Sequence, residues 1–374
     1  MSAEKAKAFG AVVAKLINSE NLTRSEAREM FFQILNNEQS DMQQGAFLAA
    51  LTAKGATAEE IAGVWEAIYE LDTVKVDPEA DLPLVDNCGT GMDTLKTFNI
   101  STAASIIAAA EGIPMAKHGA RAISSVCGTI DILEELGVDV ECDSEVVKKS
   151  IENAGIGIFN GMSPKVHPQA LGRILSQISF GTVLNIAASL ANPALPKYAV
   201  RGVYAKEMLE PVALVMREIG YKKALVVHGL SADGTQGMDE ASTLGETFIA
   251  ELKEDGNIVN YSFLPEELNI KRVTREEVSP LAEREQEAAR LVKVLTGLDN
   301  EACSDIVCLN AALVLYLTNK SLTIKEGYLK AKETIRSGRA IAKLRNWVEQ
   351  QNSNREKGRS KLERFIPQSA VLQS

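Results

Sequence analysis

The chain has 374 residues, of which 45% are hydrophobic, so it can bury a large core and form two domains or one large one. Its formal net charge of -10 and pI near 5.1 argue against non-specific nucleic-acid binding, which depends on clustered Lys and Arg. Because there is no apolar stretch of signal-peptide or membrane-spanning length, we expect a cytoplasmic protein with no membrane partner. Five widely spaced cysteines without a CxxC pair predict reduced, mostly buried thiols.

Residues 1–76 predict a series of short helices. Capping boxes, in which Ser or Thr precedes Glu or Gln by three residues, stand at Thr23 with Glu26, Ser40 with Gln43, and Thr57 with Glu60. Apolar residues then recur three and four positions apart, as in Ile61, Val64, Trp65, Ile68 and Leu71. Such apolar stripes need a partner, so we expect the helices to pack on one another as a small bundle.

Beyond residue 73 the pattern changes. The segment TVKVDPEADLP is rich in Pro and Asp and is typical of a linker, with a domain boundary near Val76. The β-type runs PLVDNC, IPMAKHG, KKALVVHG and ETFIAEL then alternate with helical stretches such as residues 102–111. This alternation predicts a large α/β domain with a mainly parallel sheet.

The end of the chain predicts two helices and a tail. Thr323 and Glu326 form another capping box, and a further helical stretch runs from Arg339 to Glu349. Residues 351–374 are mostly polar, so we expect a loosely attached tail.

The first cluster of chemical interest is residues 88–102, CGTGMDTLKTFNIST, between a predicted strand and a predicted helix. Small residues let backbone N–H groups approach an anion, and Ser101 and Thr102 stand where a helix N-terminus presents unpaired donors. The pattern indicates a phosphate site, although a tight strand-to-helix turn with a Ser or Thr cap would look the same.

Two further clusters lie downstream. Lys117 and Arg121, flanked by the hydroxyls of Ser124 and Ser125, suit a multiply charged phosphate, but equally fit a solvated basic loop. In Gly237-Met238-Asp239-Glu240, adjacent carboxylates on a Gly-rich loop suit Mg²⁺, although such pairs are usually solvated surface.

Between about Leu22 and Val348 the chain resembles the anthranilate phosphoribosyltransferase family, which shares a fold group with pyrimidine nucleoside phosphorylases. The resemblance rests on ordered motifs: LTRSEA, SDMQQGAFLAAL, GTG with TFNIST, KHGAR, GTIDILEELGV, HPQA, NIAASLANP, RGVY, GMDE and LTIKEGYLKAKETIRSGRAIAKL. It implies a helical domain of residues 1–76 plus about 168–193, and an α/β domain of residues 77–167 and 194–350 that binds phosphoribosyl pyrophosphate in the intervening cleft.

The resemblance also implies roles for individual residues. Lys117 and Arg121 would act in catalysis, and Ser101, Asp239 and Glu240 would hold Mg²⁺ as the cofactor. The donor and acceptor would contact Gly89, Met92, Asp93, Thr97, Asn99, Ser101, Thr102, Lys117, His118, Gly119, Ala120, Arg121, Ser124, Ser125, Thr129 and Leu175.

The sequence departs from the family at the acceptor side and at the glycine turn. The family's GTGGDG is GTGMDT here, so Met92 brings a side chain near the leaving group. The family's acceptor-facing asparagine is Ala120, its carboxylate-binding arginine aligns with Leu175, and its Gly-Pro aligns with Ala188-Ser189. Arg173 could replace the missing arginine only in a different helix register.

These observations predict a magnesium-dependent phosphoribosyltransferase that acts on the nitrogen of an aromatic amine, anthranilate or a related acceptor, as in tryptophan biosynthesis. Two alternatives remain at this point: a nucleoside or nucleotide phosphorylase, and a non-catalytic binding protein on the same fold. The resemblance further implies a homodimer formed through the helical domain, with no nucleic-acid partner.

Overall fold

The computed structural model describes residues 3–81, 83–91, 93–121, 127–178 and 180–367. Within these ranges a sheet with strand order β3-β2-β1-β4-β5-β7-β8 forms the centre, and the short β6 pairs with β5 at its side. The strands are β1 Val85–Cys88, β2 Met115–Gly119, β3 Ile156–Asn160, β4 Tyr198–Gly202, β5 Lys223–Leu230, β6 Gly237–Met238, β7 Thr247–Leu252 and β8 Ile258–Phe263.

The sheet is mainly parallel, as predicted. Strands β3, β2, β1, β4 and β5 run in one direction, with Val85 of β1 opposite Met115 of β2 and Tyr198 of β4. Strands β6, β7 and β8 are antiparallel to their neighbours. The run ETFIAEL therefore forms β7 as an antiparallel return from β5, without a crossover helix.

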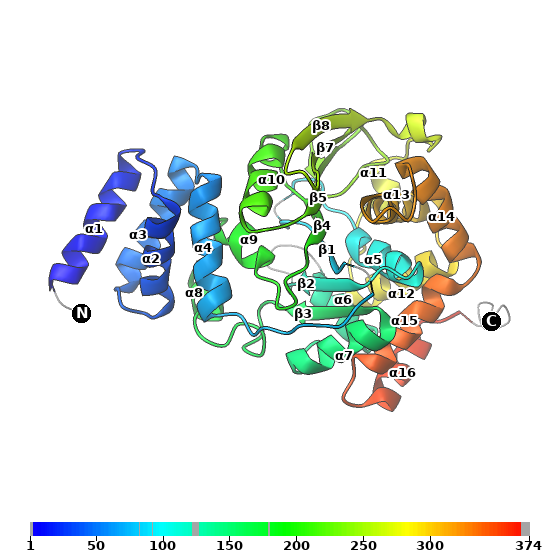
Figure 1. Ribbon diagram of the computed structural model, residues 1–374. Coiled ribbons are helices and arrows are strands. Elements are labelled where there is room, and N and C mark those ends of the chain that lie inside the picture. Colours follow the sequence, from blue (N-terminus) through cyan, green and yellow to red (C-terminus); the bar gives the residue numbers. More distant parts are fainter. Residues whose placement is uncertain (1–2, 82, 92, 122–126, 179, 368–374) are drawn as a thin grey trace.

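The helices surround this sheet and form a separate layer at the N-terminal end of the molecule (Figure 1). Those before β4 are α1 Ala3–Ile17, α2 Arg24–Leu35, α3 Asp41–Lys54, α4 Ala58–Leu71, α5 Ile100–Ala110, α6 Thr129–Glu135, α7 Ser144–Ala154, α8 Leu171–Gln177, α9 Leu184–Ala187 and the 3-10 helix η1 Ala188–Leu190. Those after it are η2 Lys206–Met208, α10 Leu209–Glu218, η3 Pro265–Leu268, α11 Arg275–Val278, α12 Arg284–Thr296, α13 Glu301–Leu317, α14 Ile324–Arg336, α15 Arg339–Gln350 and α16 Arg355–Glu363.

Two apolar clusters cover the two faces of the sheet. Leu225 and Val227 of β5 point into the cluster that contains α5 and α12 to α15, whereas Ala224 and Val226 point into the other. That second cluster runs without a break through α10, α9 and α8 into the bundle of α1 to α4. The bundle is thus attached to one face of the sheet by continuous apolar packing, and domain boundaries at residues 76, 168 and 193 stay predictions.

No single helix among the described residues has the length and apolar composition needed to cross a membrane. Helices α12 and α13 meet that test only as a pair, bent by 74° at the break between them.

The predicted helix starts are found, but not every capping bond. Thr23 with Glu26 and Thr57 with Glu60 form complete capping boxes. Ser40 is the N-cap of α3 without a side-chain bond, so the predicted box with Gln43 is wrong. At α14 the Thr323 hydroxyl accepts from the Glu326 N–H, while the Glu326 carboxylate accepts from Leu322 one residue earlier than expected.

The expected loose attachment of the C-terminal tail is wrong for residues 351–367. Gln351 is fully buried, and its amide bonds both the N–H and the carbonyl of Ile158 in β3. Helix α16 follows, with Leu362 buried and the Lys361 ammonium bonded to the Glu134 carbonyl. The segment looks like a tail only because its few apolar residues are far apart in the sequence. Residues 368–374 lie outside the described part.

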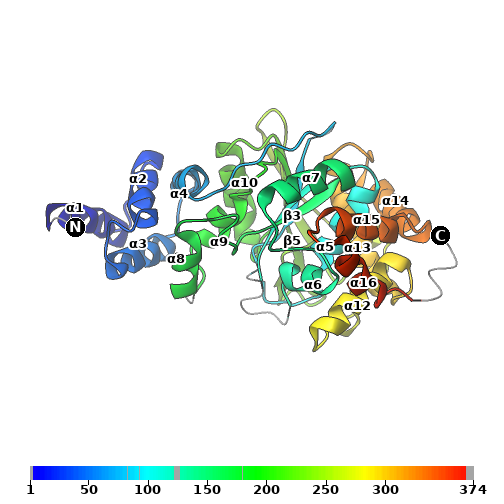
Figure 2. The ribbon, with the colours of Figure 1, turned by 90° about the horizontal axis from the view of Figure 1, so that it is seen from below.

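The linker after α4 runs in extended form along one edge of the molecule (Figure 2). Val74 donates to the Val166 carbonyl and Val76 to the Pro193 carbonyl, so the linker lies against the segment that carries α8 and α9. At its start Asp72, fully buried, accepts hydrogen bonds from three backbone N–H groups, those of Gln169 at 2.5 Å, Ala170 at 2.9 Å and Leu171 at 2.6 Å. This carboxylate joins the end of α4 to the beginning of α8.

Replacing Asp72 with Ala should destabilise the protein by about 2–3 kcal/mol, because it leaves buried N–H groups without an acceptor and removes the cap of α8. Denaturant unfolding of Asp72→Ala beside Asp81→Ala, an exposed aspartate of the same linker, measures the difference. Equal stability of the two variants would show that the hydrogen bonds of Asp72 make no net contribution to the free energy of unfolding.

Candidate active site

The carboxyl ends of β1, β4 and β5 bring the predicted glycine turn and the predicted acidic loop together. Gly89 follows β1, and a Cβ on it would overlap the Asp239 carboxylate; a Cβ on Gly202, at the end of β4, would overlap the Asp239 carbonyl. Glycine is therefore required at both positions for the loops to approach. The Gly91 N–H donates to Asp239 Oδ2 at 2.7 Å, and Gly237 accepts from the N–H groups of Thr94 and Leu95.

Three carboxylates meet where these loops touch. Asp93, Asp239 and Glu240 each offer an oxygen, and the three oxygens lie within 4.8 Å of one another. Lys96 lies 2.9 Å from Asp93, and the Asp93 side chain is only 8% exposed. Oxygen Oε2 of Glu240 is buried without a hydrogen-bond partner among the described residues.

The cluster is electrostatically strained. Burial, and then the negative charge of Asp239, raises the pKa of Asp93 to about 6. The same two causes raise the pKa of Glu240 well above its ordinary value. Because each carboxylate disfavours ionisation of the next, a cation between them would be bound favourably.

The donor set fits a hard divalent cation. Mg²⁺ prefers carboxylate oxygens and keeps waters that bridge to phosphates, and the cluster supplies three such groups, one with an unused buried oxygen. The sequence had predicted Asp239 and Glu240 as ligands but had placed Asp93 against the donor. Ser101, the third predicted ligand, is half-buried in the first turn of α5, where its carbonyl accepts from Asn87 and Ser105.

The N-terminus of α5 follows the Asp93 member of this cluster closely in the chain. Its N-cap, Asn99, makes no side-chain capping bond, and its amide nitrogen donates to the Cys127 carbonyl. Thr129 donates to the Asn99 side chain and Thr102 donates to Thr129, both at 3.4 Å. The structure thus brings together three predicted donor-binding residues at a helix N-terminus, which favours anions. Thr97, just before it, donates to the Phe98 carbonyl.

Lys117 is not exposed to a ligand in this structure. It is 1% exposed on β2, and its ammonium donates to the Asn87 carbonyl and, at 3.1 Å, to the Ser105 hydroxyl. Burial lowers its pKa, while the nearby carboxylate of Asp86 opposes that change. A direct contact with a phosphate would require the ammonium to leave both partners.

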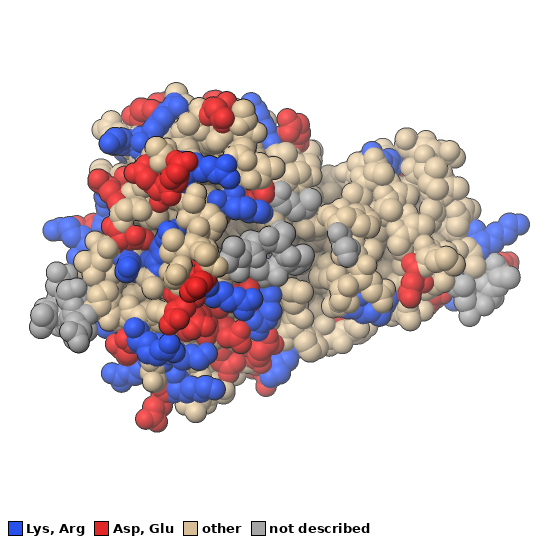
Figure 3. Space-filling model, turned by 180° about the vertical axis from the view of Figure 1, so that it is seen from behind, with Lys and Arg blue, Asp and Glu red and all other residues tan. Residues whose placement is uncertain are grey.

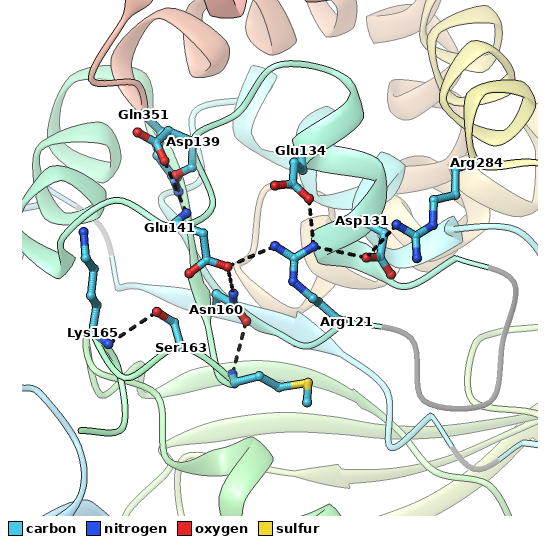
Figure 4. A network of polar contacts seen from close by, with 11 residues as sticks. Arg121, Asp131, Glu134, Asp139, Glu141, Asn160, Ser163, Lys165, Arg284 and Gln351 are labelled. Atoms are coloured by element: carbon cyan, nitrogen blue, oxygen red, sulfur yellow. Dashed lines mark hydrogen bonds and ion pairs between the residues drawn. The ribbon is translucent and has the colours of Figure 1, made fainter. Parts of the chain in front are cut away.

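Arg121 is also occupied. Its guanidinium forms ion pairs with Asp131 at 3.2 Å, Glu134 at 2.7 Å and Glu141 at 3.0 Å, and these hydrogen bonds raise its pKa (Figure 4). Asp131 also lies 3.5 Å from Arg284 of α12. In this arrangement the predicted catalytic cation is part of a network that fixes the loop after β2 to α6.

His118 forms a buried pair with His167. Their Nε2 atoms are 3.4 Å apart, while His118 Nδ1 faces the Ser189 carbonyl and His167 Nδ1 faces the Asp72 carbonyl. Because carbonyls only accept, both Nδ1 atoms carry the proton. Burial lowers the pKa of each ring to about 4, so both are neutral at physiological pH. Gly119 and Ala120 continue the strand end, and Ala120 accepts from Ile130.

The predicted acceptor side has no free arginine from α8. Leu175 packs partly buried against the apolar cluster of the bundle. Arg173 donates to Gln44 and to the Ile34 carbonyl, so it cannot replace the missing arginine in this register. Ser189 instead accepts from Arg201 of β4, a 1% exposed arginine that also donates to Cys88 Sγ.

Sequence reasoning missed Arg201, His167 and the role of Asp93 in the acidic cluster. Arg201 and His167 stand in the RGVY and HPQA motifs, but a motif does not show where one of its side chains points. Three predicted contacts, Met92, Ser124 and Ser125, lie outside the described residues.

The distribution of surface charge is consistent with anion binding at a local site rather than over a broad basic surface. On the face seen in Figure 3, Lys and Arg are interspersed with Asp and Glu over the larger part of the molecule, and no continuous basic face is visible. The smaller part, which carries the helical bundle, shows few charged residues on that face.

Comparison with known families matches both parts of the chain. Residues 11–71 match the helical bundle domain of a glycosyl transferase family, and residues 81–341 match the a/b domain of the same family.

Individual relatives match the sequence of this chain over most of their length. The chain is 38% identical over 344 residues to an anthranilate phosphoribosyltransferase from Methanococcoides burtonii, covering 91% of this chain and 94% of that protein. It is 37% identical to one from a Thermoanaerobacter species, covering 91% and 97%. The crystal structure of the Thermus thermophilus anthranilate phosphoribosyltransferase superposes with a TM-score of 0.81 at 33% identity, covering 91% and 98%. The Saccharomyces cerevisiae enzyme with PRPP and Mg has the same fold, with a TM-score of 0.79 at 24% identity, covering 93% and 99%.

If carboxylate repulsion dominates the site, Glu240→Gln should raise the free energy of unfolding in the absence of divalent ions by about 1 kcal/mol. Added Mg²⁺ should raise the melting temperature of the unsubstituted protein and have little effect on the variant, because a ligand stabilises only the state that binds it. Glu276→Gln, at an exposed position of α11, serves as the control. A less stable Glu240→Gln, or an equal response to Mg²⁺, would contradict this account.

Proposed function

Because the chain belongs to the glycosyltransferase family whose helical-bundle and α/β domains it matches, we propose that it transfers the 5-phosphoribosyl group from phosphoribosyl pyrophosphate to the nitrogen of an aromatic amine, releasing pyrophosphate. The acceptor is anthranilate or a related arylamine. The observation that carries this proposal is the agreement, along nine tenths of the chain, with enzymes of that activity at 34–38% identity. The acidic cluster beside the glycine turn supports it independently.

The two alternatives from the sequence are not favoured. The relatives reported above are anthranilate phosphoribosyltransferases, and none is a phosphorylase. A non-catalytic protein would have no need to keep three mutually repelling buried carboxylates, which cost stability when no cation is bound.

The geometry suits this chemistry. Displacing pyrophosphate from the anomeric carbon builds positive charge on the ribose and negative charge on the leaving group. The protein must therefore neutralise the negative charge of the leaving group and position the nucleophile. Mg²⁺ held by Asp93, Asp239 and Glu240 would neutralise the pyrophosphate. The N-terminus of α5 is the positive end of a helix dipole and so favours a phosphate, while the side chains of Asn99, Thr102 and Thr129 are bonded to one another beside it. The proposed contacts of Gly89, Thr97, Ser101, Lys117, His118 and Arg121 with the donor stay predictions.

An aromatic amine needs little help from a general base, because its nitrogen is already a weakly basic, unprotonated nucleophile. This agrees with the state of the buried histidines: His118 and His167 are neutral, and each donates from Nδ1 to a backbone carbonyl. Neither is paired with a carboxylate side chain in the way that a catalytic base usually is.

We propose a cytoplasmic location and, with anthranilate as acceptor, a place in tryptophan biosynthesis. All five cysteines are free thiols, and Cys127, Cys303 and Cys308 are buried, as the sequence predicted. Free thiols are typical of a reducing compartment.

The direct test is an assay of pyrophosphate release from phosphoribosyl pyrophosphate with Mg²⁺ and a panel of arylamines that includes anthranilate. Release that depends on both the arylamine and Mg²⁺ would support the proposal. Cleavage of nucleosides by inorganic phosphate, without arylamine-dependent release, would support a phosphorylase instead.

The acceptor side generates a sharper prediction. With Leu175 in place of an arginine, and Arg173 bound to the bundle, the anthranilate carboxylate would lose water without gaining a paired cation from α8. We therefore expect an uncharged ring amine to be preferred, and Leu175→Arg to raise kcat/KM for anthranilate about tenfold or more, since a charge-assisted bond contributes about 1.5–3 kcal/mol.

Steady-state kinetics on both acceptors measure this preference, with Leu175→Met as an uncharged control of similar size. A kcat/KM for anthranilate of about 10⁴ M⁻¹s⁻¹ or higher in the unsubstituted protein would contradict the prediction. It would show that other residues recognise the carboxylate.

We also propose a homodimer formed through the helical domain. Met42 at the start of α3 is 85% exposed and Ile17 at the end of α1 is 70% exposed, on the part of the molecule that shows few charges in Figure 3. Exposed apolar side chains on the helical domain would be covered in a dimer formed through it. Light scattering should give the mass of a dimer at micromolar concentration for the intact chain, and a monomer would contradict the proposal.

A further inference from the structure

A pocket lies at the opposite end of the parallel strands from the candidate active site. It has a volume of about 640 Å³ and is formed by Tyr69 of α4, the linker from Lys75 to Asp77, residues 194–198 before and at the start of β4, and Lys222 just before β5. The acidic cluster, by contrast, follows the carboxyl ends of β1 and β5. The pocket is therefore separate from the site described above.

Three lysines make the pocket basic in a protein whose net charge is -10. Lys197 and Lys222 have no ion pair or side-chain hydrogen bond with any described residue. Among the described residues, Lys75 donates only to the Glu70 carbonyl, and it lies over the Tyr69 ring at 5.3 Å. The one acidic side chain in the lining is that of Asp77, which is exposed. Unpaired cations that share a pocket favour an anionic occupant.

Repulsion between two of these lysines supports this reading. Burial and the neighbouring charge of Lys222 both lower the pKa of Lys197. The backbone holds them together, because the Lys222 N–H donates to the Lys197 carbonyl at 2.8 Å. An anion between the two ammonium groups would relieve their repulsion.

The remaining lining is aromatic and apolar. Tyr69 stacks on Trp65, with ring centroids 5.2 Å apart, and the Tyr198 hydroxyl is fixed by Glu254 at 2.8 Å. Val76, Leu84 and Leu195 complete the apolar wall. Two positioned rings beside apolar side chains suit a flat apolar group.

The backbone of Leu195, in this wall, is held in an unfavourable conformation. Its φ is +46°, in the left-handed region that a bulky residue rarely occupies, and its N–H closes a turn on the Asn192 carbonyl at 3.0 Å. Such strained residues concentrate at ligand sites, where the surrounding structure holds them in place.

We propose that this pocket binds a small aromatic carboxylate, with the carboxylate between Lys197 and Lys222 and the ring against Tyr69, Tyr198 and Leu195. A neighbouring hollow of about 440 Å³ shares Tyr69 and Lys75, but there Arg28 is paired with Glu70 at 2.6 Å and Glu66 adds a second carboxylate, so its cations are offset. The proposal concerns binding alone and holds whether or not the chain catalyses phosphoribosyl transfer.

The occupant would contact both parts of the molecule. Tyr69 belongs to the helical bundle and Tyr198 to the sheet, and the linker between them forms part of the wall. Residues 189–198, which lead into β4, line the pocket at one end and approach the candidate active site at the other, since the Ser189 carbonyl contacts His118 and the Asn192 amide donates to the Ala116 carbonyl of β2. A ligand here is placed to influence how the bundle sits on the sheet.

Calorimetric titration with benzoate tests the proposal on the full chain. We expect a Kd of about 1 mM or tighter. Benzamide, which lacks the charge, and acetate, which lacks the ring, should each bind about tenfold more weakly or worse on the unsubstituted protein. These two probes need no variant and therefore cannot be affected by misfolding.

Variants locate the site. In Lys197→Met with Lys222→Met, benzoate affinity should fall about tenfold or more, while Lys271→Met, at an exposed lysine after η3, should leave it unchanged. Pyrophosphate release by the double variant should equal that of the unsubstituted protein, which separates failure of this proposal from failure of the proposed function.

Three results would overturn the inference. They are a benzoate Kd much weaker than about 1 mM, a benzoate affinity in the double variant equal to that of the unsubstituted protein, or inorganic phosphate binding at least as tightly as benzoate. The second would place benzoate elsewhere, such as the acceptor site. The third would mean that the pocket recognises charge without the ring.

Discussion

The mutual repulsion of three closely packed, largely buried carboxylates is the constraint on which the rest of the candidate site depends. Asp93, Asp239 and Glu240 come from two loops that are about 145 residues apart in sequence, and they stay together only because the backbone forces them to. Gly89 and Gly202 allow that approach, since any side chain there would collide with Asp239. The Gly91 N–H and Lys96 then hold two of the carboxylates in place. The site is thus strained in favour of a cation, and the energy of that strain is available for binding Mg²⁺ and its phosphate ligand.

Much of the fold could be predicted because it depends on local patterns. Capping residues such as Thr23 and Thr57 and apolar spacing give the helices of the bundle, and the alternation of β-type runs with helices gives the parallel sheet. Contacts between distant segments could not be predicted in this way. Nothing local distinguishes Gln351 from other glutamines, yet it bonds the backbone of β3 and attaches the C-terminal segment. Likewise, nothing local to Asp72, which directly follows the apolar stripe ending at Leu71, shows that it caps α8 about a hundred residues later.

In the candidate site, too, local motifs could be predicted from the sequence and contacts between distant segments could not. Motifs identified the glycine turn, the start of α5 and the Asp239-Glu240 pair, because each is contiguous in sequence. They could not show which way a side chain points. Lys117 and Arg121 have the right charge for a phosphate, but the first is buried against Asn87 and the second is paired with three carboxylates. The family resemblance implies a donor contact for Asp93, whereas its position beside Asp239 depends on the loop from β5, which only the tertiary structure supplies.

The central claim is that Mg²⁺ held by this cluster is what allows the donor to bind, and calorimetric titration of phosphoribosyl pyrophosphate tests it most directly. Because an unneutralised pyrophosphate would meet three carboxylates, the account predicts measurable affinity with Mg²⁺, and loss of that affinity in EDTA or in Asp239→Ala. A donor affinity that is the same with Mg²⁺, with EDTA and in Asp239→Ala would contradict it.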